Sequence, residues 1–177
     1  MNKFPLVICI TLFLLSLISC TEEFQQGVSF DEEEFSLQKS KWEALGIENY
    51  SFTYSFGKGS IWFYVVGKVS VVEGKANPVV FDTEYSYYTE EIDSSSEYYL
   101  EDMNAVFDVI YNSYLESIEK SIINNSFIKY NLFYESKYEF PRQATSYEDK
   151  NEASSKASSA GQPNDNFYLE ISDFQCN

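Results

Sequence analysis

The sequence contains no histidine. Histidine is the general base of Ser-His-Asp and Cys-His catalysis, the usual proton shuttle at neutral pH and a common ligand of zinc. Its absence excludes these arrangements in a chain of 177 residues. Enzymes that work through carboxylates alone remain open. We predict no cofactor and no metal ion for this protein.

Basic residues are also scarce. Twelve Lys and Arg stand against 28 Asp and Glu, which gives a formal net charge of −16 at pH 7. A field of this sign repels phosphates and anionic lipid headgroups. We therefore expect no nucleic-acid partner, and we do not expect a basic surface to attach the protein to a membrane.

The N-terminal residues are typical of an export signal. Lys3 supplies one positive charge, and an apolar run from Phe4 to Ile18 follows, which is shorter than the roughly 20 residues of a membrane span. The run ends in Leu17-Ile18-Ser19-Cys20, which resembles the bacterial lipobox. An uncleaved membrane anchor, or a secretory signal with a chance cysteine, are the alternatives.

The lipobox resemblance implies a lipid modification of Cys20 and a location at a membrane. The Cys20 sulfur would take a diacylglycerol thioether, the chain would be cleaved before Cys20, and the new amino group would be acylated, for example by palmitate. One acyl chain binds membranes only marginally, whereas two or three on one cysteine hold a protein permanently in practice. We expect attachment to the cell membrane or outer membrane, on its periplasmic or extracellular face. Thr21, in place of Asp, slightly favours the outer membrane or the cell surface.

Cysteine is too rare for a disulfide framework. With Cys9 in the signal and Cys20 lipidated, Cys176 would be left alone, so no intramolecular disulfide is expected. Cys176 is either a reactive nucleophile or, as we favour, a bystander thiol, because no histidine is present to activate it.

The chain divides into three parts. We predict a cleaved signal peptide over 1–19, the lipidated cysteine and a tether over 20–28, and a single α+β domain over 29–177. The domain would have flexible segments near 73–98 and 149–165. The second segment contains no aromatic or branched aliphatic residue with which to form a core.

Two helices are predicted. The first spans 31–45, with a capping box of Ser29 and Glu32 before it and Gly46 after it. Its inward residues are Phe35, Gln38, Trp42 and Leu45. The second begins near Leu100 and ends at Asn124-Asn125-Ser126. Its apolar stripe is Met103, Val106, Phe107, Ile110, Tyr114, Leu115 and Ile118.

Strands are predicted where apolar and polar residues alternate. Tyr50, Phe52, Tyr54 and Phe56 share one strand face, which is either a core face, as we favour, or a platform for stacking sugars or bases. Gly57-Lys58-Gly59 is expected to be a turn. Residues 60–72 are either two strands with a hairpin at Gly67-Lys68 or one strand with a bulge at Gly67. Further strands are expected over 79–81, 127–134, 142–147 and 166–174.

This order predicts a doubled α-β-β unit. Two helices would pack on one face of an antiparallel sheet in a two-layer α+β sandwich.

Two acidic groups are candidate sites. Asp31 to Glu34 is a cation site or, as we favour, a first helical turn matched to the helix dipole. The tyrosine-rich segment that holds Glu84, Glu90, Glu91 and Asp93 is a partner loop, a calcium loop or a solvated loop. It also supplies candidates for a two-carboxylate glycosidase.

Several short motifs resemble an uncharacterised family of exported bacterial lipoproteins, known only as a domain of unknown function. They are Trp42, Gly46-Ile47-x-x-Tyr50-Ser51-Phe52-Thr53, Val66-Gly67-Lys68-Val69, Val106-Phe107 and Tyr134 leading to Phe140-Pro141. Relatives carry cysteines after the first strand, where this chain has Phe56 to Ser60, so a disulfide there is missing. The element order is similar to PepSY and β-lactamase-inhibitor-protein-like modules, which implies binding or inhibition rather than catalysis.

The sequence therefore favours a lipid-anchored, non-catalytic binding or inhibitory module with a protein or glycan partner in the cell envelope. A structural, surface-exposed lipoprotein without a small-molecule ligand is the alternative, and a carboxylate-based glycan hydrolase ranks third. The oligomeric state is left open.

Overall fold

The computed structural model describes residues 27–59, 64–84, 92–149 and 166–176. The predicted signal peptide, Cys20, most of the tether, Glu90, Glu91 and most of the segment 149–165 lie outside the described residues. Gly27 and Val28, which the sequence assigned to the tether, already pair with Phe127 and Ile128 of the sheet.

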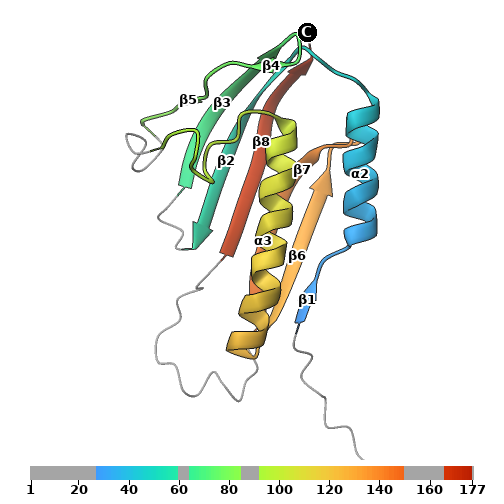
Figure 1. Ribbon diagram of the computed structural model, residues 1–177, viewed down its shortest axis with the longest axis vertical. Coiled ribbons are helices and arrows are strands. Elements are labelled where there is room, and N and C mark those ends of the chain that lie inside the picture. Colours follow the sequence, from blue (N-terminus) through green and yellow to red (C-terminus); the bar gives the residue numbers. More distant parts are fainter. Residues whose placement is uncertain (1–26, 60–63, 85–91, 150–165, 177) are drawn as a thin grey trace, which may run out of the picture.

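The described chain forms two helices and one large sheet (Figure 1). In order, the elements are β1 (Gly27–Ser29), α2 (Glu32–Ala44), β2 (Tyr50–Gly59), β3 (Tyr64–Val72), β4 (Lys75–Ala76), β5 (Val80–Phe81), α3 (Met103–Asn124), β6 (Phe127–Tyr134), β7 (Pro141–Asp149) and β8 (Asn166–Cys176). No helix in these described ranges has both the length and the apolar content that a membrane crossing requires.

The sheet has eight strands in the order β1-β6-β7-β8-β2-β3-β4, with β5 also paired to β3. All pairs are antiparallel except β1 with β6. The α+β class is therefore confirmed. The sheet is larger than the doubled α-β-β unit that we predicted, because β1 and β4 add to it and β5, the short strand expected over 79–81, pairs with β3 in the same sheet. β1 and β4 have three and two residues, which is too short for alternation to be visible in sequence.

Both helices cover the same face of the sheet (Figure 1). The register places the inward residues of β2, β3 and β8 side by side, and Tyr54, for example, lies between Gly67 and Ile171. They form one core cluster with Phe35 and Trp42 of α2 and with Met103, Val106, Phe107 and Ile110 of α3. The aromatic face of β2 is thus buried core, as we favoured, and not a stacking platform.

Two turns predicted between 57 and 72 are wrong. Residues Gly57 to Gly59 continue β2 and pair with Phe167 and its neighbours in β8. The predicted hairpin at Gly67-Lys68 lies inside β3, which runs past Gly67 against β2 without a shift of register. The alternative of a single strand holds over the described residues 64–72, but it has no bulge.

The helix ends differ in detail from the prediction. Asp31 is the N-cap of α2, since its carboxylate accepts from the backbone N–H of Glu34 at 2.9 Å. The capping box of Ser29 and Glu32 is wrong, because Ser29 pairs in β1 and the side chain of Glu32 accepts from Tyr114 instead. Gly46 follows the helix with φ of +58°, as predicted for a residue after a C-cap.

The predicted inward stripes were too apolar. Leu45, Leu115 and Ile118 are exposed, whereas Ser113, Ser117 and Ser121 are buried on α3. Ser113 and Ser117 lie on the sheet side because the Tyr130 hydroxyl is available to them there, as described below, and Ser121 donates to the Ile118 carbonyl of its own helix. Periodicity ranks residues by hydrophobicity and cannot show such partners.

Candidate functional site

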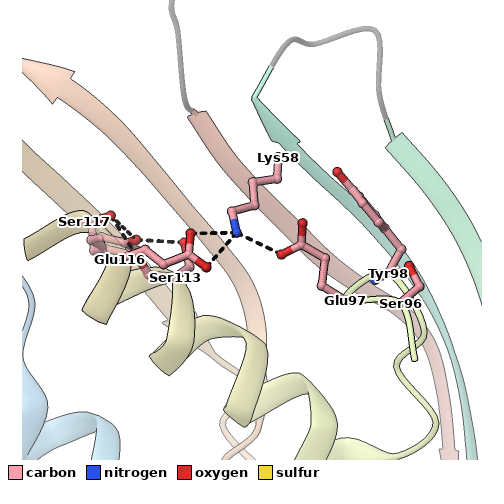
Figure 2. A network of polar contacts seen from close by, with 8 residues as sticks. Lys58, Ser96, Glu97, Tyr98, Ser113, Glu116 and Ser117 are labelled. Atoms are coloured by element: carbon pink, nitrogen blue, oxygen red, sulfur yellow. Dashed lines mark hydrogen bonds and ion pairs between the residues drawn. The ribbon is translucent and has the colours of Figure 1, made fainter. Parts of the chain in front are cut away.

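Lys58 lies near the end of β2 and joins two parts of the chain that are far apart in sequence. Its Nζ contacts Glu97 Oε2 at 2.8 Å and Glu116 Oε2 at 2.8 Å. Figure 2 shows the ammonium group between the two carboxylates. The Lys58 side chain is 19% exposed, whereas each glutamate is about half exposed. The site is therefore a charged bridge at the rim of the core.

Glu97 is held by the segment that leads into α3. Asp93 accepts from the N–H and the hydroxyl of Ser95, which closes a turn. The Tyr54 hydroxyl then donates to the Tyr98 carbonyl at 2.7 Å and accepts from the N–H of Leu100. A fully buried tyrosine thus fixes the backbone next to Glu97.

Glu116 is held by α3 and by a buried hydroxyl cluster beneath it. The Tyr130 hydroxyl of β6 lies 2.9 Å from Ser113 Oγ and 2.8 Å from Ser117 Oγ. Ser117 also donates to the Ser113 carbonyl within the helix. These bonds fix the rotation of α3 about its axis, so Glu116 is presented on the side that faces Lys58 (Figure 2).

The surroundings of Lys58 favour its charged form. Burial by itself lowers the pKa of Lys58, but hydrogen bonds to Glu116 and Glu97 outweigh it and raise the pKa above its usual value. Lys58 is therefore a cation throughout the physiological range, and the three groups together carry one net negative charge.

A groove of about 550 Å³ opens beside this bridge. Phe56 and Phe167 lie at its base, and its lining includes Lys58, Glu97, Asp108, Asn112, Leu115 and Glu116. Its volume is within the range typical of small-molecule sites. On the other side of Lys58, near Ser117 and Ile128, a second space of about 20 Å³ has room for roughly one water molecule.

The described carboxylates that the sequence singled out lie outside this site, and Glu90 and Glu91 are not among the described residues. Glu84 and Asp93 are both exposed, and hydrogen bonds from Ser95 lower the pKa of Asp93. The acidic residues 31–34 form the N-cap and first turn of α2, as we favoured. Within the described ranges, no group of three or more Asp, Glu or Cys side chains is placed to hold a metal ion. Cys176 is an exposed free thiol.

Sequence reasoning missed the bridge altogether. Lys58 was placed in a turn, and its partners are 39 and 58 residues away. Glu97 and Glu116 are ordinary members of an acidic chain, so no local signal distinguishes them. A lysine between two glycines in a chain poor in basic residues was the one available hint.

No protein-family model, curated protein or solved structure matches this chain.

Proposed function

We propose that this chain is a lipid-anchored protein of the bacterial cell envelope whose domain binds a protein segment or a glycan in the groove beside Lys58. It would act as a binding or inhibitory module without catalysis. The observation that carries the proposal is the groove itself, with its charged bridge. The lipid anchor rests on the residues Leu17 to Cys20.

The groove suits a polar ligand that offers hydrogen-bond donors. Glu97 and Glu116 each expose about half of their side chains, so their carboxylates can accept further bonds. Asn112, which also lines the groove, offers both a donor and an acceptor. Leu115 and Val109 add apolar contact. Hydroxyl groups of a glycan, or amides and amines of a peptide, match this lining.

The charged bridge argues against hydrolysis. A retaining glycosidase needs two carboxylates roughly 5 Å apart, one of them protonated. The Lys58 ammonium lies between Glu97 and Glu116 and contacts both carboxylates, so it occupies the space in which a scissile bond would have to lie (Figure 2). A glycan hydrolase is thus the weaker alternative. A structural surface lipoprotein without a ligand is the stronger one.

The layout of two helices on one face of an antiparallel sheet supports the proposal by analogy. PepSY and β-lactamase-inhibitor-protein-like modules, which the element order resembles, act by binding. A doubled α-β-β unit at the centre of the larger sheet remains our proposal for how the fold is organised.

The proposal is tested by capture from envelope extracts and by a glycan array, with the groove blocked in a second protein. Asn112→Trp fills the groove from α3, whereas Asn131→Trp, a matched control, changes an exposed asparagine of β6 outside the groove. We expect wild type and Asn131→Trp to bind the same partner and Asn112→Trp to lose it. No partner at micromolar concentration would favour the structural alternative, and equal binding by both variants would overturn the groove as the binding site.

A further inference from the structure

The C-terminal end of α3 exposes isoleucines. Ile122 is 63% exposed and Ile123 is 80% exposed, and Ile118 lies one turn earlier at 36%. We refer to these three residues as the apolar tip. They contrast with the buried stripe of the same helix, which packs on the sheet. Exposed side chains of this size, gathered at one end of a helix, are typical of an interaction surface.

The tip is also uncharged, in a chain where 23% of residues carry a charge. The eight residues from Ser121 to Ile128 include no Asp, Glu, Lys or Arg. The residues that flank this run, Lys120 and Lys129, are both lysines. The stretch that holds Ile122 and Ile123 therefore carries no charged side chain of its own, although Glu119 lies just before Lys120 and Glu148 pairs with Ile128 on the neighbouring strand.

Lys129 extends over the rings of Phe127 and Tyr147. A lysine stem that covers apolar surface in this way suits the headgroup region of a bilayer.

The tip lies where the tether to Cys20 enters the domain. The N–H of Gly27 donates to the Ser126 carbonyl at 3.3 Å, and β1 runs parallel to β6 from the same end. Figure 1 shows β1 beginning beside the C-terminal end of α3. Six residues lie between Cys20 and Gly27. Covalent geometry limits the distance they span to roughly 25 Å, so a lipidated Cys20 keeps this end of the domain at the membrane.

We propose that the apolar tip contacts the bilayer in which Cys20 is anchored. The inference rests on the proposed lipid anchor and adds an orientation to it. The tip enters the interfacial region, and α3 points away from the membrane. Glu116, at the rim of the Lys58 groove, then lies about 10 Å above Ile123, since Ile123 follows Glu116 by seven residues of helix. Partners near the membrane surface would be within reach of the groove.

The test uses the full-length lipoprotein in cells and, after purification, in phosphatidylethanolamine vesicles with a minor share of phosphatidylglycerol. A photoreactive benzophenone amino acid replaces Ile122, Ile123 or, as a control, Val80. Val80 is 64% exposed, which matches Ile122, and it lies in β5 at the opposite edge of the sheet from β1. Acyl labelling and thermal unfolding are measured on each variant.

We expect lipid adducts to be several-fold more abundant from positions 122 and 123 than from position 80. Equal adducts at all three positions, with normal acyl labelling, would overturn the tip contact and leave the anchor intact. Adducts to a second copy or to another protein at 122 and 123 would also overturn it, because that partner would then cover the tip. Loss of acyl labelling from every variant would instead overturn the anchor, and the tip contact with it.

Discussion

The ring of Tyr54 lies directly against Gly67 on the neighbouring strand. A Cβ atom at Gly67 would lie 2.3 Å from Cζ of Tyr54, which is closer than real Cβ atoms come to other heavy atoms. The ring is fully buried, and its hydroxyl bonds the backbone of Tyr98 and Leu100. A glycine in the middle of β3 therefore makes room for the tyrosine that holds the segment next to Glu97.

Replacing Gly67 should destabilise the protein through this contact. Gly67→Ala forces the Tyr54 ring to move, and overpacking of a well-packed core costs about 1–3 kcal/mol. We expect a lower free energy of unfolding in urea by that amount. Ser55→Ala, on the partly exposed face of β2, is the control and should change the free energy by less than about 0.5 kcal/mol. Equal effects of the two variants would show that the close approach carries no energetic weight.

Tyr130→Phe should be costly because it leaves the buried Ser113 hydroxyl without its partner and leaves Ser117 with only the Ser113 carbonyl. Ser113 and Ser117 both lie within hydrogen-bond distance of the Tyr130 hydroxyl, and a buried unsatisfied group costs about 1–3 kcal/mol. The triple variant Tyr130→Phe, Ser113→Ala and Ser117→Ala removes all three hydroxyls together. Denaturant unfolding should find it more stable than Tyr130→Phe alone. A triple variant less stable than the single one would contradict this account of the cluster.

Stability should fall at alkaline pH. Burial raises the pKa of Tyr50 and Tyr130, and the hydrogen bond to Glu32 raises the pKa of Tyr114 to about 12. In the unfolded chain tyrosines ionise near pH 10, so only the unfolded state loses these protons between pH 10 and the raised pKa values. The stabilisation is thus fully present below about pH 10 and is lost as the pH rises further.

Urea unfolding at a series of pH values measures this loss. Below about pH 10 these tyrosines should not change the urea concentration at the midpoint of unfolding. Above about pH 10 that concentration should fall. In Tyr114→Phe the fall between about pH 10 and 12 should be shallower, because one of the groups responsible is gone. An unchanged slope in that variant would mean that Tyr114 ionises normally in the folded protein.

The Lys58 bridge should show a small, salt-sensitive coupling. A double-mutant cycle of Lys58→Met and Glu116→Gln should give about 0.5–1 kcal/mol, because Glu116 is about half exposed and solvent screens the pair. Raising the salt concentration should reduce it. Lys68 and Asp82, 3.8 Å apart with Lys68 61% exposed, form the control pair and should show coupling near zero. Coupling at Lys58 no larger than in the control would argue against a formed bridge.

The lipid anchor predicts the behaviour of Cys20→Ser. Without the thiol no thioether forms, so acyl labelling should disappear and the protein should leave the membrane fraction. Cell fractionation followed by an alkaline carbonate wash measures both. Cys176→Ser, which removes the other cysteine outside the predicted signal, should remain labelled and membrane-bound. A Cys20→Ser protein that resists the carbonate wash would refute the anchor.

The sequence correctly predicted those helices and strands in which apolar residues recur at a regular spacing. Strict alternation placed Tyr50, Phe52, Tyr54 and Phe56 on one buried face, and it did the same for the inward residues of β8. The spacing of three and four residues predicted α3 and its first turns. Each spacing shows which side of one helix or strand is removed from water. These spacings were therefore enough to predict the α+β class.

Tertiary structure decided the features that depend on partners distant in sequence. The local sequence around Gly67 indicates a turn, but Gly67 lies inside a strand. The residue is a glycine because the Tyr54 ring occupies the space that a side chain would need. Ser113 and Ser117 read as exposed polar residues, but Tyr130 satisfies them in the core.

The candidate site belongs to this second class. Lys58 acquires its role only when the fold brings it to Glu97 and Glu116. What the sequence by itself determined is thus the composition and the periodic faces, and the export signal is a prediction from it. The fold alone decided which polar groups meet, because the energy of a hydrogen bond or an ion pair depends on distance and burial and not on separation along the chain.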